Sequence, residues 1–219
     1  YLRKSHIPFV VQGRTEDCDD YAWLDIDNEK AFIDAMDHLV GLGHRKIAYL
    51  GGDPDLNYAW QRRSGYLSAA KTHGCDVLDG YLHDGITDEM AARHAVADLL
   101  KHPDRPTAIL CVTDAVAIGA IHALAHAGIT VGEEISVIGF DGLPMGEAIH
   151  PGLTTMSQAS YQVGRAVGQI VVAQANETKE ANAPASEFPQ ILWEATLTIR
   201  GSANPPAPKP VTNAKGGIS

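Results

Sequence analysis

Short apolar runs alternate with amphipathic segments along most of this chain, and that alternation limits its fold more than any other feature. Runs typical of buried strands stand at residues 7–11, 46–50, 107–112 and 135–140. Between the first two, five apolar residues share one face at helical spacing: Phe32, Ala35, Met36, Leu39 and Val40. Alternating helices and nearly continuous apolar strands indicate parallel sheets covered by helices on both faces. The sequence therefore predicts an α/β fold.

The ends of these elements carry recognisable local signals. Asp27 or Asn28 can cap the first helix, and Gly74 is placed to end the second near His73. The stretch 190–200 reads as a single closing strand. Residues 203–219 are rich in Pro, Gly, Ser and Asn with almost no apolar anchor, so we expect a disordered tail there.

Composition excludes several classes of function. The formal net charge is -10, with 27 acidic against 17 basic residues, so this chain is not expected to bind nucleic acid itself. Its longest apolar runs are too short to cross a membrane, and no secretory signal opens the chain. Cys18, Cys75 and Cys111 form no CxxC pair, which argues against a disulfide framework or a zinc site and fits the reducing cytoplasm.

Parallel α/β sheets bind ligands beyond the carboxyl ends of their strands. The residues that follow predicted strands here are polar and mixed in charge: Arg14, Asp53, Gly85, Ile86, Thr113, Asp114 and Asp141. Such a set suits a sugar or a nucleobase. His122 and His126 are four apart but lack the glutamate of a HExxH site, so we expect no metal. We also find no catalytic constellation and no cofactor motif, and therefore expect no enzyme.

Six stretches then become recognisable together: "HLVGLGHRKIAYLGG", "RRSGYLSA", "RPTAILCVTDAVAIGAIHAL", "GITVGEEISVIGFDG", "PGLTTMSQ" and "IRGS". In this order and spacing they resemble the LacI–GalR family of bacterial transcription regulators. The resemblance implies a two-lobed periplasmic-binding-protein-like fold with a ligand cleft between the lobes, and a DNA-binding helix-turn-helix that this sequence lacks. It places 1–23 and 159–186 in an incomplete first lobe, and 24–158 and 187–202 in the second.

The resemblance also assigns roles to single residues. Arg62 stands in the family's R-x-x-G motif, so it is expected as an exposed cleft arginine whose removal hardly changes stability; the alternative is a surface arginine. Asp141 matches the family's G-x-D aspartate and is expected to bind the ligand. The alternative is that it caps the helix or turn that follows. Asp114 is expected to cap the next helix, while its neighbour Thr113 touches the ligand. The expected ligand-binding residues are Arg14, Asp25, Tyr58, Arg62, Ile86, Thr113, Asp141 and Gln158.

The function implied is a sensor core of a transcription regulator that binds a sugar or related small polar effector. The family further implies a homodimer, here through the helix around Met90, Ala91 and His94 and through residues 143–149, and operator DNA as a partner only through the missing head. The alternative is a secreted sugar-binding protein of an ABC transporter, with an α/β enzyme as a distant third. Ile86 replaces a stacking aromatic of some relatives, leaving Tyr58, Trp60 or Trp23 as possible platforms.

Overall fold

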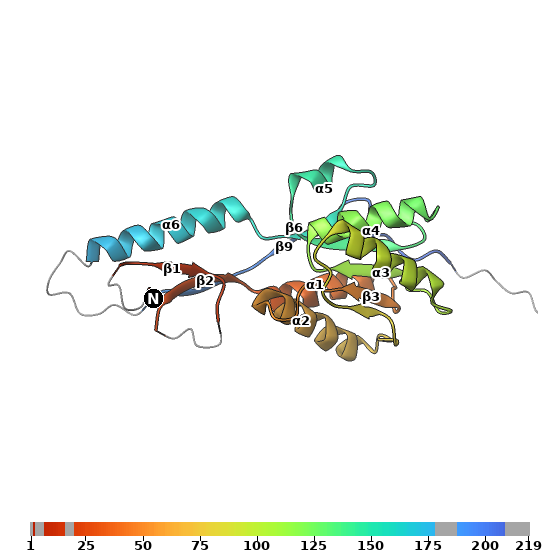
Figure 1. The fold of residues 1–219 in the computed structure, drawn as a ribbon, viewed down its shortest axis with the longest axis horizontal. Helices are drawn as coiled ribbons and strands as arrows, with labels where there is room; N and C mark the ends of the chain where they lie inside the picture. Colours follow the sequence, from red (N-terminus) through yellow and green to blue (C-terminus); the bar gives the residue numbers. More distant parts are fainter. Residues whose placement is uncertain (1, 3–6, 16–19, 178–187, 209–219) are drawn as a thin grey trace, which may run out of the picture.

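The computed structural model describes residues 2, 7–15, 20–177 and 188–208. Two sheets lie at opposite ends of an elongated molecule (Figure 1). The larger sheet has six strands in the order β4-β3-β5-β6-β7-β9, and the smaller has the order β1-β2-β8. All neighbouring strands are parallel except β7 and β9. The predicted two-lobed α/β architecture is therefore confirmed.

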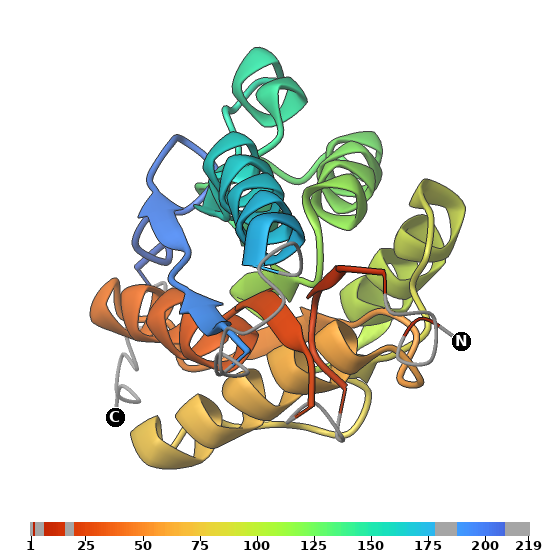
Figure 2. The same cartoon turned by 90° about the vertical axis from the view of Figure 1, so that its left-hand side faces the viewer.

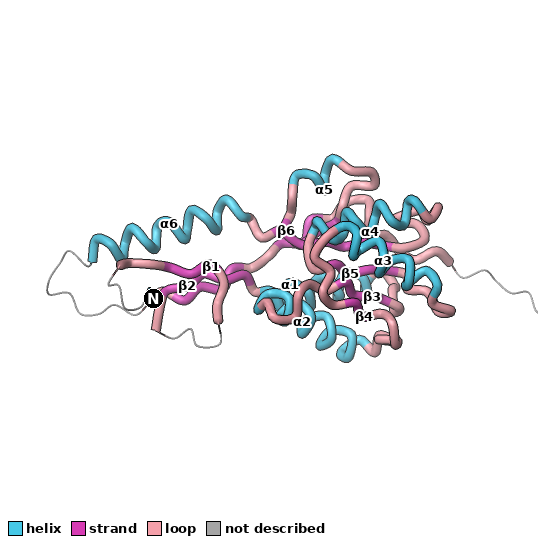
Figure 3. Tube along the Cα trace, in the orientation of Figure 1, coloured by secondary structure: helices cyan, strands magenta, loops and turns pink. Residues whose placement is uncertain are grey.

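The elements follow the predicted alternation (Figure 3). The strands are β1 (Val10–Gln12), β2 (Ala22–Ile26), β3 (Ile47–Leu50), β4 (Leu82–His83), β5 (Ala108–Cys111), β6 (Ser136–Asp141), β7 (Thr154–Ser157), β8 (Gln190–Trp193) and β9 (Thr196–Thr198). The helices are α1 (Asn28–Gly41), α2 (Asn57–His73), α3 (Glu89–Lys101), α4 (Asp114–His126), α5 (Pro144–Ala148) and α6 (Ser160–Glu177).

Helices cover both faces of the larger sheet (Figure 2). On one face, α1 and α2 bury a cluster that includes Phe32, Tyr66 and Phe140. On the other, α3 and α4 bury a cluster that includes Val96 and Ile121. The smaller sheet packs against α6, which buries Val163.

Local chemistry explains where these helices begin and how closely they approach. The Asp27 carboxylate accepts the Lys30 backbone N–H and so caps α1, as expected. Gly74 ends α2 in the left-handed conformation that glycine adopts without strain. At Gly65 the two helices touch, because a Cβ there would lie 2.3 Å from the Glu29 carbonyl oxygen. The R-x-x-G glycine is thus a packing requirement of α1 against α2.

Three expectations need correction. The closing segment is two strands in different sheets, since β8 pairs with β2 whereas β9 pairs with β7. The smaller sheet consequently extends to Ile26, beyond the expected end of the first lobe at residue 23. It also includes residues 190–193, which were expected in the second lobe. The start of the expected tail also packs on the larger lobe: Ala203 is buried, and the Asn204 carbonyl accepts hydrogen bonds from His44 and Ser136. The rest of the expected tail, 209–219, and residues 178–187 lie outside the described part of the chain.

The chain passes between the two sheets three times, and the crossings lie side by side. Ile26 at the end of β2 is paired with Trp193, and Ser157 at the end of β7 is paired with Thr196. The β8–β9 crossing is therefore flanked by the other two. Within the described residues no helix is long and apolar enough to traverse a bilayer.

Candidate ligand-binding site

Arg62 lies in the second turn of α2, as predicted, but it is not exposed. Only 5% of its surface is accessible, because α2 packs this position against α1 and the ends of β5 and β6. Its Nε donates to Asn28 Oδ1 at 2.8 Å, and one terminal nitrogen donates to the Val112 carbonyl at 2.7 Å. These bonds replace water around the buried cation, so the expectation that this cleft arginine is exposed was wrong.

Two aromatic rings flank the Arg62 guanidinium. Its central carbon lies 3.6 Å from the ring centre of Phe140 and 4.7 Å from that of Tyr58. Burial lowers the pKa of Arg62 to about 10, and the negative charge of Asp141 opposes that shift. The guanidinium stays charged at neutral pH, held as a flat donor between aromatic faces.

Asp141 ends β6 directly after Phe140. Its backbone has φ 129°, a conformation strained for any residue with a side chain, and such strain concentrates at functional sites. Its carboxylate accepts Gln158 Nε2 at 2.9 Å and the backbone N–H of Asp114. Burial raises the pKa of Asp141 to about 6, while the nearby positive charge of Arg62 lowers it. The structure thus brings Arg62, Asp141 and Gln158 into one neighbourhood, as predicted.

Asp114 plays a different part from the helix cap that we expected. The cap of α4 is Thr113, whose hydroxyl accepts the Val116 backbone N–H at 3.3 Å. The fully buried Asp114 carboxylate accepts the Leu143 N–H at 2.7 Å and the Thr155 hydroxyl at 2.6 Å. Asp114 therefore fixes the turn that follows Asp141. Burial raises its pKa, and these hydrogen bonds oppose the rise.

The glycine of "VIGFD" makes room for that carboxylate. A Cβ on Gly139 would lie 2.3 Å from Asp114 Oδ1, so any larger residue would displace the side chain that holds the turn.

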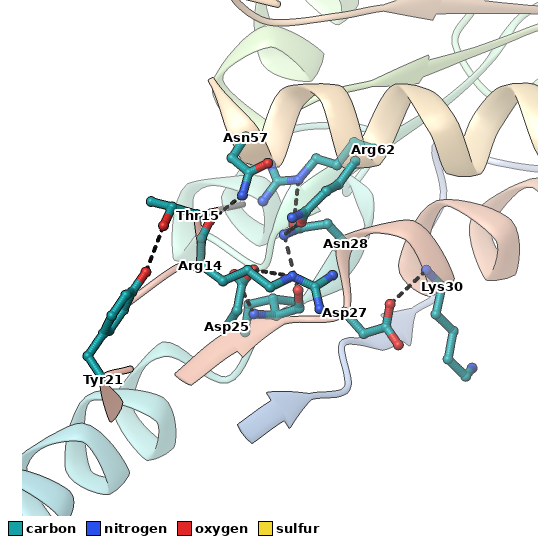
Figure 4. Close-up of polar contacts among 11 residues, drawn as sticks. Arg14, Thr15, Tyr21, Asp25, Asp27, Asn28, Lys30, Asn57 and Arg62 are labelled. Atoms are coloured by element: carbon teal, nitrogen blue, oxygen red, sulfur yellow. Dashed lines mark hydrogen bonds and ion pairs between the residues drawn. The ribbon is translucent and has the colours of Figure 1, made fainter. Parts of the chain in front are cut away.

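Arg14 and Asp25 lie on the smaller-sheet side of the crossing. Their side chains pair at 3.4 Å, and the Arg14 guanidinium also lies 5.8 Å from the ring centre of Trp23. The side chain of Asn57, at the start of α2, donates to the Arg14 carbonyl and so joins the two lobes (Figure 4). These two predicted residues are therefore placed where the lobes meet.

The remaining candidates are less well placed. Ile86 packs in the core beneath α3 and α4, and its aliphatic side chain has neither a ring face nor a hydrogen-bonding group for a sugar. Trp60 is 59% exposed and lines an outer face of α2 with Arg63 and Lys71. Of the aromatic platforms considered, Tyr58 alone stacks on the guanidinium of Arg62.

Two residues of the site were missed. Asn28, considered only as a helix cap, is the acceptor for Arg62, and Gln61 binds the amide of Asn28 at 2.8 Å. Their only sequence signal is polarity at positions that the helical pattern turns inward.

In the part of the chain that the structure describes, the histidines and cysteines that could hold a metal or act as nucleophiles lie in unsuitable surroundings. Among the described residues, no cluster of three or more His, Cys, Asp or Glu side chains could hold a metal. His122 instead contacts Glu89 at 3.2 Å on the surface. Cys111 is buried as expected, and burial raises the pKa of its thiol.

Comparison with known proteins agrees with this architecture. A family model for the periplasmic binding protein-like domain matches residues 36–203. The HTH-type transcriptional regulator AglR of Rhizobium meliloti (strain 1021) is 34% identical over 218 residues, which are 97% of this chain and 59% of that protein. A regulatory protein of the LacI family from Chloroflexus aggregans has a similar crystal structure, with TM-score 0.82, 34% identity and coverage of 92% of this chain and 70% of that one. This chain belongs to the LacI family.

Catabolite control protein A of Priestia megaterium, at 31% identity over 80% of this chain and 53% of its own length, is a further LacI-family relative. The 219 residues thus span little more than half the length of the curated relatives that they match. They correspond to the effector-binding core of the LacI family. The names of the relatives favour a regulator over the transporter component that we kept as the alternative.

Proposed function

We propose that this chain is the sensor core of a LacI-type transcription regulator and that it binds a sugar or related small polar metabolite between its lobes. The observation that carries the proposal is the buried guanidinium of Arg62 beside the strained carboxylate of Asp141, at the carboxyl ends of parallel strands. A fork of N–H donors and a carboxylate acceptor together match neighbouring hydroxyl groups.

A sugar fits this arrangement better than a purely apolar or purely ionic ligand. Tyr58 offers a flat face beside the donors, while Gln158 adds an amide next to Asp141. A LacI-type structural neighbour at 25% identity, the transcriptional regulator CelR, is a complex with cellobiose. On the smaller lobe, Arg14 and Asp25 are the proposed contacts from the opposite side.

The mechanism that we propose is a shift between lobe arrangements. A ligand that touches both lobes binds one arrangement more tightly and so increases its population. In a dimer, that shift would change the spacing of the DNA-binding heads, which lie outside these residues. The chain itself, with net charge -10, is not expected to bind operator DNA, and the relatives' role as regulators supports a cytoplasmic site of action.

For the dimer, we propose the surface formed by the start of α3 and the segment around α5. Met90 and Met145 are 57% and 62% exposed, and α3 and α4 enclose a groove lined by Met90, His94 and His126. Exposed apolar side chains of this kind often mark interfaces. Sedimentation equilibrium of the complete protein should show two subunits, and a strict monomer at micromolar concentration would refute the interface.

The ligand proposal is tested by a thermal-shift screen of the complete protein with cellobiose, maltose, ribose, polyols and sugar acids. A specific ligand raises the melting temperature by mass action. Calorimetry then compares Arg62→Lys, which keeps the charge but loses the fork, with Arg63→Lys. The control arginine is adjacent and partly exposed, and it pairs with Asp84. Loss of one charge-assisted hydrogen bond predicts about tenfold to hundredfold weaker binding for Arg62→Lys alone; equal affinity in both variants contradicts the proposal.

A further inference from the structure

A chain of side-chain amides connects Arg62 to the crossing segment between the lobes. Arg62 Nε donates to Asn28 Oδ1 at 2.8 Å, and Asn28 Nδ2 donates to Gln61 Oε1 at 2.8 Å. Gln61 lies close enough to Asp25 to oppose the rise that burial causes in the pKa of that carboxyl. Both hydrogen bonds run in the same direction, from the guanidinium through Asn28 to Gln61.

All four groups are almost inaccessible to water: Asp25, Asn28, Gln61 and Arg62 are 7%, 1%, 5% and 5% exposed. A buried polar group without a partner is strongly unfavourable, so each amide must keep its orientation to satisfy its neighbours. Aligned hydrogen bonds also polarise one another and gain strength together. The orientation of Arg62 is therefore tied to those of Asn28 and Gln61.

Both amide hydrogens of Asn28 are used in this arrangement. Its Oδ1 accepts from Arg62, and its Nδ2 also donates to the Ile26 carbonyl at 3.1 Å. Asn28 is the first residue of α1 and directly follows the crossing out of β2 (Figure 4). A change in the angle of the crossing must therefore move the acceptor that holds Arg62.

We propose that Asn28 is a positioning residue which, held by the Ile26 carbonyl and by Gln61, couples the ligand-ready orientation of Arg62 to the crossing between β2 and α1. The proposal rests on the proposed function for its consequence in ligand binding. The coupling of Arg62 to the crossing through Asn28 can be tested without any ligand. When the lobes open, the hydrogen bond from Arg62 Nε to Asn28 should break at the same time.

Nuclear magnetic resonance of the complete protein labelled with ¹⁵N-arginine tests this coupling without a ligand. The Nε–H signal of Arg62, assigned by its absence in Arg62→Lys, should exchange slowly with solvent. Asn28→Ala should speed that exchange at least tenfold. Gln61→Leu, which leaves the Asn28–Arg62 bond in place, should speed it several-fold.

Two further variants separate positioning from general loosening of α1. Asn28→Asp keeps an acceptor for Arg62 but loses the donor to Gln61, so its exchange should be slower than in Asn28→Ala and no slower than in Gln61→Leu. Asp27→Ala removes the α1 cap next door without touching Arg62, and should leave the exchange unchanged. Equal exchange in Asn28→Ala and wild type, or equal acceleration by Asp27→Ala, overturns the proposal.

Calorimetric titration with cellobiose, maltose and ribose gives the second readout. For any of these sugars that binds wild type, Asn28→Ala should weaken binding about tenfold, while Asp27→Ala should not. Unchanged affinity in Asn28→Ala overturns the positioning role. If none of the three sugars binds, the choice of ligand in the proposed function fails, and the exchange data still decide the role of Asn28.

Discussion

The charge of Asp141 should make the ligand-free protein less stable at neutral pH. Burial raises the pKa of this carboxyl from 3.8 to about 6, so the folded state holds its proton more tightly than the unfolded chain. Two pKa units correspond to about 3 kcal/mol of differential interaction, and solvent reaching this half-buried side chain reduces that figure. Asp141→Asn removes the charge, but its amide N–H would then oppose one of the two donors, Gln158 Nε2 or the Asp114 N–H. The expected gain at pH 7 is therefore about 1–2 kcal/mol.

The sign of the pH dependence follows from the raised pKa. A group with a raised folded-state pKa contributes its full stability below its unfolded value, and that stability is lost as pH rises through the folded value. The gain from Asp141→Asn should thus be absent below pH 3.8, grow toward a pH of about 6, and remain constant above it.

Urea denaturation of the complete protein between pH 4 and pH 8 measures this difference. In thermal melts at pH 7, the same gain should raise the melting temperature by about 2–8 °C for a protein of this size. Asp98→Asn is the control, because a hydrogen bond from Lys101 lowers the pKa of that exposed carboxyl and predicts a small effect of opposite sign. A variant that is less stable at pH 7, or whose gain does not vary with pH, would refute the reasoning. Asp141→Asn should also bind its sugar more weakly than the wild type does.

Three other predictions concern the fold that supports the site. Burial lowers the pKa of His44 from 6.5, so the unfolded chain takes up this proton more readily; stability should be complete above pH 6.5 and fall below it, and His44→Gln should flatten that fall in urea titrations. Gly65→Ala should lower the free energy of unfolding by about 1–3 kcal/mol, because the added Cβ meets the Glu29 carbonyl; an unchanged urea midpoint would contradict this contact. Gly139→Ala should displace Asp114 and therefore reduce both the melting temperature and sugar affinity, and retention of full affinity would show that Asp114 does not hold Asp141 in place.

The sequence predicted elements whose signals are local. A buried strand such as β5 is recognisable from its apolar run alone, and Gly74 ends α2 by its own backbone preference. The division of 190–200 into β8 and β9 was missed because both halves have strand-like composition, and only distant partners assign them to different sheets.

Burial of charge was harder to foresee than burial of apolar groups. Arg62 is stabilised inside the protein by Asn28, Val112 and Phe140, which belong to three separate segments of the chain. Thr113 and Asp114 are both good capping residues, so only the register of α4 decides between them. In the tail, a proline-rich composition concealed that the backbone of Asn204 completes the hydrogen bonds of His44.

The three crossings of the chain lie side by side, and the strands next to them are paired edge to edge. Pairing between Ile26 and Trp193, and between Ser157 and Thr196, resists sliding of one lobe past the other. The pairing ends after Asp27, whose backbone N–H still donates to the Trp193 carbonyl at 2.9 Å, at Ala159 with its φ of 50° and between Trp193 and Thr196, so bending is expected at these points. Rotation of one lobe against the other should therefore occur about an axis that passes through these three crossings. A small rotation beside the ligand then becomes a displacement that increases with distance from the crossings.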